Sequence, residues 1–364
     1  MRQLKGYQPL CIIKNKVLLY KKGKLFLYDE KTDSYQVVLK LKSGFFNKIK
    51  ESLRLSSRLF RMGVRNALPI SENEVLLTFD KALFHVSLSD KKVTKLIKMK
   101  KGFSNPLNLC APLKGTKYIA LFGDYGNNAD RQSVSIYGVD ESLSIKKVYT
   151  FPPKTIRHIH NIICDELNNG YYVFTGDNEP KAGIYWADAD FNIMKPIYIG
   201  NQKARAVCGF MTERGLLYAT DSVSQKNYIY LLTINNNQPS IQEITPINGS
   251  CIYATRYSTG YVFSTTVESE ESNGNKIFSL LSTKRGKGIL SDDVHLIYVS
   301  SQLKAKIIGV YKKDKLPYKL FQYGVIRFPS GLENYNKLII NPCAVRGVDG
   351  NTVFLNFKDK DIEG

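Results

Sequence analysis

The sequence predicts an all-β protein, a β-propeller of seven blades, with six blades as the alternative. An apolar run that ends in a carboxylate returns along the chain at Asp80, Asp124, Asp177 and Asp221, and Thr265 takes the place of the acid in a fifth run. A repeat of roughly 44 residues is typical of blades built from four short strands. Since equivalent positions of successive blades meet around one axis, we expect these acids at one end of a central funnel.

The rest of the chain supports strands. Aromatic residues make up 12% of the sequence, with 23 Tyr and 18 Phe, and such residues favour strands over helices. Turn residues separate the short apolar runs. We expect a single domain over residues 1–364. Its predicted blades span about 8–40, 64–100, 104–151, 156–200, 204–246, 250–300 and 305–360.

One segment, residues 45–62, departs from the strand pattern. It has no turn residue, and its apolar side chains recur at nearly helical spacing with basic residues between them. This pattern predicts a basic amphipathic helical insertion. The helix either lies on an anionic membrane surface or packs between the first two blades with its Lys and Arg in solvent.

The charge of the chain indicates acidic partners. Lys and Arg number 52 against 32 Asp and Glu, so the net charge is +20. This excess suits an acidic polysaccharide, a nucleotide-sugar or an anionic membrane surface. Nucleic acid is disfavoured, because no nucleic-acid-binding motif accompanies the charge.

The six cysteines lie singly in the sequence, which favours reduced, buried thiols. The first residues lack the apolar stretch of a signal peptide, and no run approaches the length of a membrane span. We therefore expect a cytoplasmic protein, with a peripheral membrane location as the alternative.

The first candidate site is the strand that begins Arg157-His158-Ile159-His160. Alternation along a strand places His158 and His160 on one face, and Asp177 ends the next strand. A carboxylate beside imidazoles can share and orient a proton near neutral pH, so we expect these three residues to be catalytic. Two alternatives stay open. The imidazoles could bond neighbouring blade loops, or hold a divalent metal, although we otherwise expect no cofactor.

A second group follows the third run, where Asp124 and Tyr125 stand side by side. A phenol beside a carboxylate can act as nucleophile or base if a nearby cation lowers its pKa, so both residues are candidate catalytic groups. The alternative is an Asp that caps its turn and a Tyr that packs.

Arginines recur near the predicted first strands, and a guanidinium clamps a carboxylate or phosphate with two hydrogen bonds. Amide and acidic groups at comparable positions suit a hydroxyl-rich ligand. The candidate substrate-binding residues are Arg61, Arg65, Arg131, Arg157, Asn161, Gln202, Arg205, Asp221 and Gln322.

The stretch from Arg157 to Asn192 resembles the sialidase-like, Asp-box β-propellers of glycoside hydrolases, most clearly over residues 105–225. The segment Asp188-Ala189-Asp190-Phe191-Asn192 looks like a degenerate Asp-box, with Asp190 in the box position. The resemblance implies a propeller that acts on glycans. The His-x-His strand looks more like propeller polysaccharide lyases, which use His or Tyr as the base and Arg to neutralise a uronate.

The sequence thus predicts a carbohydrate-active enzyme that acts on an acidic glycan by hydrolysis or β-elimination, in surface-polysaccharide metabolism. One alternative is a glycosyltransferase of capsule or lipid-linked polysaccharide assembly at the inner membrane face. Another is a non-catalytic propeller that binds a glycan or a protein. The motifs of serine hydrolases, P-loop proteins and Rossmann folds are absent from the sequence.

Overall fold

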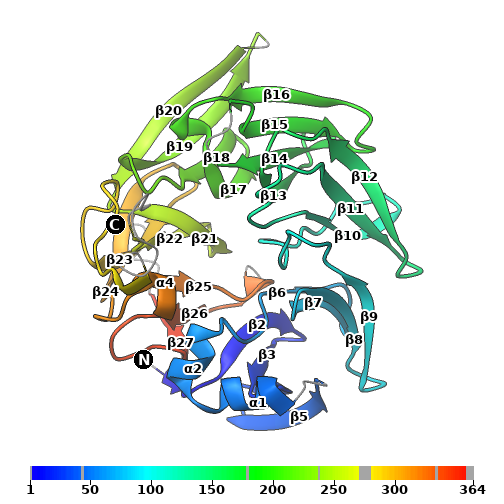
Figure 1. Ribbon diagram of the computed structural model, residues 1–364, viewed down its shortest axis with the longest axis vertical. Helices are drawn as coiled ribbons and strands as arrows, with labels where there is room; N and C mark the ends of the chain where they lie inside the picture. Colours follow the sequence, from blue (N-terminus) through cyan, green and yellow to red (C-terminus); the bar gives the residue numbers. More distant parts are fainter. Residues whose placement is uncertain are drawn as a thin grey trace. The chain divides into compact units, whose positions relative to one another are not determined.

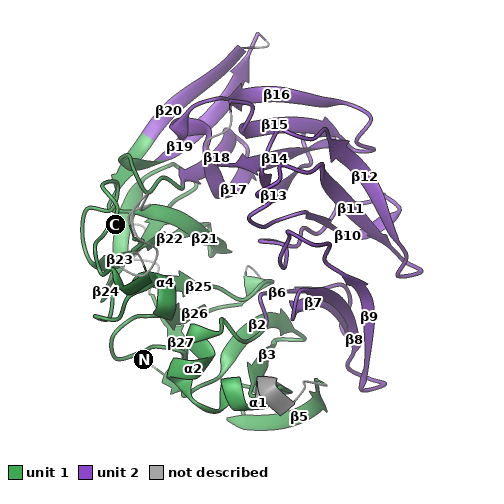
Figure 2. Ribbon diagram, viewed as in Figure 1, with its two compact units in different colours: residues 1–63, 221–228, 244–364 green, residues 64–220, 229–243 purple. Residues whose placement is uncertain are grey.

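The computed structural model describes residues 2–41, 45–177, 180–236, 238–269, 280–332 and 335–357. Within these ranges the strands form seven antiparallel sheets of three or four strands, the blades of a β-propeller (Figure 1). The predicted fold class and the count of seven are confirmed. The chain divides into two compact units (Figure 2), residues 1–63, 221–228 and 244–364, and residues 64–220 and 229–243.

The second unit holds four sheets, in which each strand pairs with the next one along the chain. The last two strands extend a few residues beyond this unit. The strands and one short helix are β6 (Asn66–Pro69), β7 (Glu74–Phe79), β8 (Ala82–Ser87) and β9 (Lys92–Lys98); β10 (Tyr118–Gly123), β11 (Val134–Asp140) and β12 (Ile145–Phe151); β13 (His158–Asp165), β14 (Gly170–Gly176), β15 (Gly183–Asp188) and β16 (Met194–Ile199); η1 (Gln202–Ala204); and β17 (Ala206–Thr212), β18 (Gly215–Thr220), β19 (Asn227–Asn235) and β20 (Gln238–Ile247).

The first unit holds three sheets. Their strands are β2 (Gln8–Ile13), β3 (Lys16–Lys21), β4 (Lys24–Asp29) and β5 (Ser34–Lys40); β21 (Ser250–Tyr257), β22 (Gly260–Thr266), β23 (Asp293–Val299) and β24 (Ala305–Lys312); and β25 (Val325–Arg327), β26 (Leu338–Cys343), β27 (Thr352–Leu355) and β1 (Arg2–Leu4).

Strand pairing moves two of the predicted blade boundaries. The sixth blade runs to residue 312 instead of 300, because β24 pairs with β23 along its full length. The seventh takes its outer strand from the other end of the chain, since Gln3 of β1 lies opposite Val353 of β27. A sequence repeat shows only blades whose strands follow one another along the chain, so it could not predict that an N-terminal strand joins the last sheet.

Four of the five repeated apolar runs are the second strands of their sheets, and the run that ends at Asp124 is β10, an edge strand of the three-stranded sheet. All seven residues of β14 are buried, and β7, β18 and β22 are buried over nearly their whole length. A strand covered on both faces has no polar side to present, so its sequence is a continuous apolar run instead of an alternation. This is why the repeat was visible in the sequence.

The helical insertion is two helices, α1 (Phe45–Ser52) and α2 (Arg54–Leu59), because Leu53 between them is extended (φ −112°, ψ 142°). A further short helix, α4, spans Tyr318–Phe321. The expectation that the basic side chains of this segment lie in solvent is wrong for Arg58, which is buried. Among the described residues, no helix is long and apolar enough to cross a membrane.

The predicted Asp-box segment forms the turn from β15 to β16, and its carboxylate is not the predicted one. Asp188 Oδ1 accepts a hydrogen bond from the amide of Ile193 at 2.6 Å, and Phe191 takes the left-handed conformation (φ 59°). Asp188, instead of Asp190, therefore holds this turn.

Candidate functional site

The site forms at the start of β13, where the strand carries a bulge. His158 lies opposite Gly176 of β14, and the register shifts between Ile159 and Asn161. Ile159 packs against β10, so closely that a Cβ on Gly123 would lie 2.5 Å from the Ile159 Cβ. The isoleucine thus faces the core, and both histidines lie together over β14, as alternation predicts.

Gly176 provides the space that both imidazoles need. A Cβ at this position would lie 2.2 Å from His160 Nε2 and 2.9 Å from His158 Nε2. Any larger residue would displace the rings, so the glycine at the end of the second strand is part of the site.

Each imidazole is anchored through its Nδ1 atom to a backbone carbonyl of an adjacent sheet or loop. His158 Nδ1 lies 2.7 Å from the Gly126 oxygen, and His160 Nδ1 lies 2.8 Å from the Ala206 oxygen. A carbonyl only accepts hydrogen bonds, so both Nδ1 atoms carry a proton. In a neutral imidazole the other nitrogen, Nε2, then has a free lone pair. The alternative in which the histidines bond neighbouring blade loops therefore describes the Nδ1 atom of each ring. The Nε2 atom of each ring can still accept a proton or bind a metal.

The two Nε2 atoms face each other at 2.9 Å, and Asp177 Oδ1 lies 3.5 Å from His158 Nε2 and 3.3 Å from His160 Nε2. With both rings neutral, three groups that can only accept would converge on one point. Such an arrangement is unfavourable until a cation joins it. The cluster therefore needs either a shared proton, which makes one ring an imidazolium, or a metal ion.

Two arginines complete the surroundings of Asp177. Arg157 Nη1 lies 3.3 Å from Asp177 Oδ2, and Arg205 Nη2 lies 3.6 Å from Oδ1. Burial alone would raise the pKa of the Asp177 carboxyl, but the adjacent His158 and His160 outweigh it and hold this pKa well below its usual range. One ionised carboxylate thus faces two guanidinium groups, which leaves a positive surplus beside the imidazoles that suits an anionic ligand.

The pKa of His158 is lowered, mainly by burial and further by the like charge of His160, against the opposing effect of Asp177. A lowered pKa keeps this imidazole neutral at pH 7, which is the form that accepts a proton or binds a metal.

Tyr125 lies over the imidazoles from the loop after β10. Its ring centroid is 4.7 Å from that of His158 and 6.3 Å from that of His160. The histidines are 5% and 3% exposed, whereas Tyr125 is only half-buried. Of these three side chains, the phenol is the one that a ligand reaches first.

The donor set fits a divalent cation. His158, His160 and Asp177 each offer a ligand atom, and these atoms lie within 4.8 Å of one another. Imidazole and carboxylate are common ligands of first-row divalent metals. Metal-binding histidines usually donate their other N–H group to a carbonyl or carboxylate, as both rings do here. The divalent metal that the sequence left as an alternative therefore has a suitable site.

Asp124, the neighbour of Tyr125, has its carboxylate engaged elsewhere. Its Oδ2 atom accepts from the Ser135 amide at 2.8 Å and pairs with Lys100 Nζ at 2.7 Å. Burial raises the pKa of this carboxyl, against the opposing effect of Lys100. These contacts match the alternative in which the acid caps the end of its strand, and Lys100 is a partner that the sequence did not reveal.

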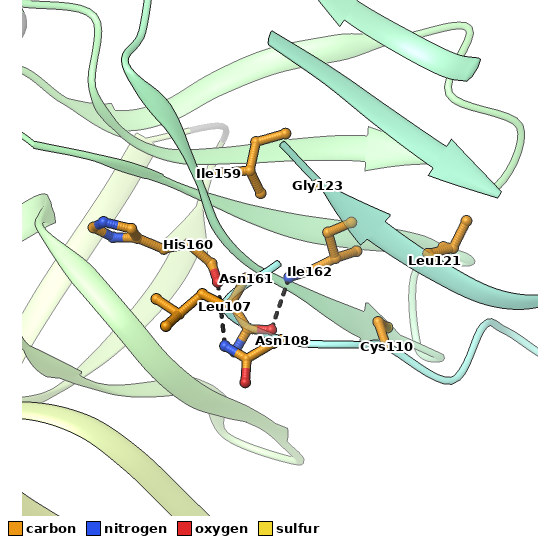
Figure 3. Close-up of a pocket in the computed structure, with 9 residues that line it drawn as sticks. All are labelled: Leu107, Asn108, Cys110, Leu121, Gly123, Ile159, His160, Asn161 and Ile162. Carbon is orange, nitrogen blue, oxygen red and sulfur yellow. Dashed lines mark hydrogen bonds between the residues drawn. The ribbon is translucent and has the colours of Figure 1, made fainter. Parts of the chain in front are cut away.

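Other predicted residues of the second unit make contacts with backbone atoms. Asn161 donates to the Val207 oxygen at 2.9 Å, and Figure 3 shows its Oδ1 bound to the Ile162 amide. Arg131 donates to the Asn128 oxygen within its own loop. Gln202 lies in η1, directly before Arg205, and its carbonyl accepts from the Arg205 amide.

Arg65 precedes β6, where its amide donates to the Thr78 oxygen. Asp80, the first acid of the repeat, forms an exposed left-handed turn with Lys81 between β7 and β8. It does not join the histidines in the structure, so the acids of the repeat do not form one equivalent set.

Three predicted residues belong to the first unit. Asp221 is buried. The pKa of Tyr323 is raised mainly by burial and further by the charges of Glu268 and Asp221, against the opposing effect of Arg61. Gln322 donates to the Arg58 oxygen at 3.0 Å and accepts from Arg327 Nη2 at 3.3 Å. Gln322 thus ties α4 to α2.

The cysteines include one pair that sequence spacing hid. Cys110 and Cys164 are 54 positions apart, and their sulfur atoms lie 3.8 Å apart. All six thiols are free, as expected, but these two are partly exposed while the other four are buried. Cys110 lines the same pocket as Asn108, which donates to the His160 oxygen (Figure 3).

No protein-family model matches the chain, and no curated protein matches it in sequence. Solved structures with a similar fold include the oligogalacturonate lyase of Vibrio parahaemolyticus, with a TM-score of 0.57 and 10% identity over 96% of this chain and 90% of that one. An oligogalacturonate lyase in complex with manganese has a TM-score of 0.53 and 9% identity over 84% and 77% of the two chains. The CNH domain of AfRom2 has a TM-score of 0.54 and 9% identity over 98% and 96%.

Similarity at this level of identity establishes the fold, a seven-bladed β-propeller, and leaves function to be argued from the site. The sialidase-like family stays a hypothesis that no family model supports.

Proposed function

We propose that this protein is a carbohydrate-active β-propeller that cleaves a uronate-containing glycan by β-elimination at the His158, His160 and Asp177 cluster. The observation that carries the proposal is the pair of Nε2 atoms facing each other at 2.9 Å beside one carboxylate and two arginines. The two arginines leave a surplus of positive charge beside the imidazoles. An acidic sugar carries the opposite charge and is therefore a suitable ligand. Oligogalacturonate lyases share the fold, and their name describes a reaction of this class.

Elimination suits the site better than hydrolysis. Glycoside hydrolysis by the usual route needs two carboxyl groups, one of them protonated as the acid. The lowered pKa of Asp177 keeps it ionised, and Asp124 is bound to Lys100 and Ser135. Elimination instead needs a base and a cluster of cations that stabilises charge on the sugar carboxylate.

In this proposal each residue has one role. Arg157 and Arg205 hold the uronate carboxylate and stabilise the negative charge that develops when the adjacent carbon loses its proton. Tyr125, as its phenolate, takes that proton, since it is half-buried beside the imidazoles. The bond from the ring to the glycosidic oxygen then breaks, and the leaving oxygen gains a proton from solvent.

His158, His160 and Asp177 would hold a divalent cation through two Nε2 atoms and a carboxylate oxygen. When bound, such an ion supplies a Lewis-acid charge that makes the proton next to the carboxylate more acidic. The tethers at Gly126 and Ala206 keep both rings aimed at the same point.

A second candidate function is non-catalytic binding of an acidic glycan. The observation that favours it is the burial of the imidazoles, with only 5% and 3% of their surfaces exposed. Under this proposal the cluster is a fixed positive centre, and the arginines make the contacts.

The test is an assay of purified protein with Mn²⁺ and a panel of uronate oligosaccharides, monitored by the ultraviolet absorbance of the unsaturated product. We expect absorbance to rise, Tyr125→Phe to lower turnover by about 10²–10⁴-fold, and Arg205→Gln to raise the KM. Tyr198→Phe and Arg214→Gln, at half-buried and exposed positions outside the cluster, are the matched controls.

Other outcomes discriminate between the alternatives. Reducing ends without absorbance would indicate hydrolysis, and consumption of a nucleotide-sugar would indicate a transferase. Binding by the unchanged protein that persists in Tyr125→Phe, with no turnover by either protein, would favour the non-catalytic candidate. Each of these results would overturn the elimination proposal.

A further inference from the structure

The helical segment α1–α2 is fixed to its unit through charged and polar groups. Glu51 is 7% exposed and accepts a hydrogen bond from the Tyr20 hydroxyl at 2.5 Å. Arg58 is 3% exposed, and its guanidinium contacts Asp314 at 2.6 Å and the Phe321 carbonyl at 2.8 Å. The side of the segment that faces the protein therefore includes its acid and one of its arginines, groups that surface helices normally turn to solvent.

The same segment also presents exposed apolar side chains. An isolated exposed Leu needs no explanation, but here five large apolar side chains are exposed within twelve positions. None of them is less than 39% exposed, and Leu53 reaches 69%. This apolar face of α1–α2 consists of Ile49, Leu53, Leu55, Leu59 and Phe60.

Basic groups border the apolar face. Residues 45–62 contain five Lys and Arg, of which Arg54 pairs with Asp349 and Arg58 with Asp314, and one acid, Glu51, which is buried. Arg61 is exposed, and the Lys50 ammonium lies 4.8 Å from the Phe60 ring centroid. An apolar face with a basic border is the pattern of helices that lie in the interface of an anionic bilayer.

We propose that the apolar face of α1–α2 docks the protein on an anionic lipid bilayer. Ile49, Leu53 and Phe60 would enter the boundary between headgroups and acyl chains, and Lys50 and Arg61 would contact the lipid phosphates. Charge decides against a second copy of the chain as the occupant, since two molecules of net charge +20 repel each other. The ion pair of Arg58 and the Tyr20–Glu51 hydrogen bond hold the segment in the orientation that presents this face.

Co-sedimentation with vesicles tests the proposal. We expect the full chain to sediment with vesicles of equal parts phosphatidylglycerol and phosphatidylcholine, and to stay in solution with phosphatidylcholine alone. The double variant Leu53→Ser/Phe60→Ser should lower the partition coefficient by at least ~10-fold. The control Leu167→Ser/Ile193→Ser, at positions 68% and 52% exposed outside this segment, should leave it unchanged.

Two results would overturn the proposal. If Leu53→Ser/Phe60→Ser binds the anionic vesicles as the unchanged protein does, the general positive charge of the chain is responsible. If light scattering shows a dimer that the same variant converts to monomer, with no vesicle binding by either protein, the face joins two copies. Thermal melts of the variants confirm that they are folded, which the exposure of both positions predicts.

Discussion

Replacing Gly176 by Ala tests how tightly the imidazole pair is built. The nearest contact of the added Cβ would be 2.2 Å, to His160 Nε2, and ordinary contact begins at 3.4 Å. The ring must therefore move by about 1.2 Å, which would break its 2.8 Å hydrogen bond to the Ala206 oxygen. Overpacking of this kind costs about 1–3 kcal/mol, and a lost hydrogen bond about 1 kcal/mol. We expect Gly176→Ala to lower the free energy of unfolding by about 2–4 kcal/mol.

The same substitution in a His160→Ala background isolates the cause. Without the imidazole, the closest obstacle is His158 Nε2 at 2.9 Å, which is the end of a side chain. The cost of Gly176→Ala should fall by at least about 1 kcal/mol in that background. Urea denaturation of the four proteins measures both values. Equal costs in the two backgrounds would refute the view that Gly176 exists to seat the rings.

Three further predictions follow from buried groups. The pKa of His158 is lower in the folded chain than its ordinary value of 6.5, so below pH 6.5 the folded chain binds fewer protons than the unfolded chain. Unfolding midpoints should therefore fall as the pH drops through 6.5, and a flat profile down to pH 5 would contradict this. Arg58→Leu should cost about 3–5 kcal/mol in denaturant unfolding, because it leaves Asp314 without its closest cation, and a cost under about 1 kcal/mol would show that the pair is not needed. A thiol oxidant such as diamide should join Cys110 to Cys164, which a thiol titration would detect as two lost thiols; because hydrogen bonding to Cys164 and burial raise the pKa of Cys110, the reaction should speed up at alkaline pH.

The sequence was sufficient to predict the fold and to predict that His158, His160 and Asp177 lie together. Burial of β7, β14, β18 and β22 on both faces produced most of the repeat, and alternation along β13 placed His158 and His160 together. Asp177 was found because it ends the strand that pairs with theirs. These predictions depend on local periodicity, which neighbouring strands convert directly into contact.

Features that depend on distant contacts were not predictable. The anchors at Gly126 and Ala206 are backbone carbonyls, which carry no mark in a sequence. Lys100 lies in the loop between β9 and β10 and pairs with Asp124. Asp124 matched the repeat, but this ion pair gives it a different environment from that of Asp177. The inverted polarity of α1–α2 was hidden because helical spacing does not say which side faces the protein.

The most direct test of the central claim is long-range ¹H–¹⁵N NMR of the imidazoles, of which the chain has only four. The account predicts that His158 and His160 carry their protons on Nδ1, and that both Nε2 resonances shift when Zn²⁺ is added as a diamagnetic divalent ion. His160→Ala should abolish the response of His158. Protons on the two Nε2 atoms, with no change on adding the metal, would contradict the account and leave the pair as a packing feature of the blades.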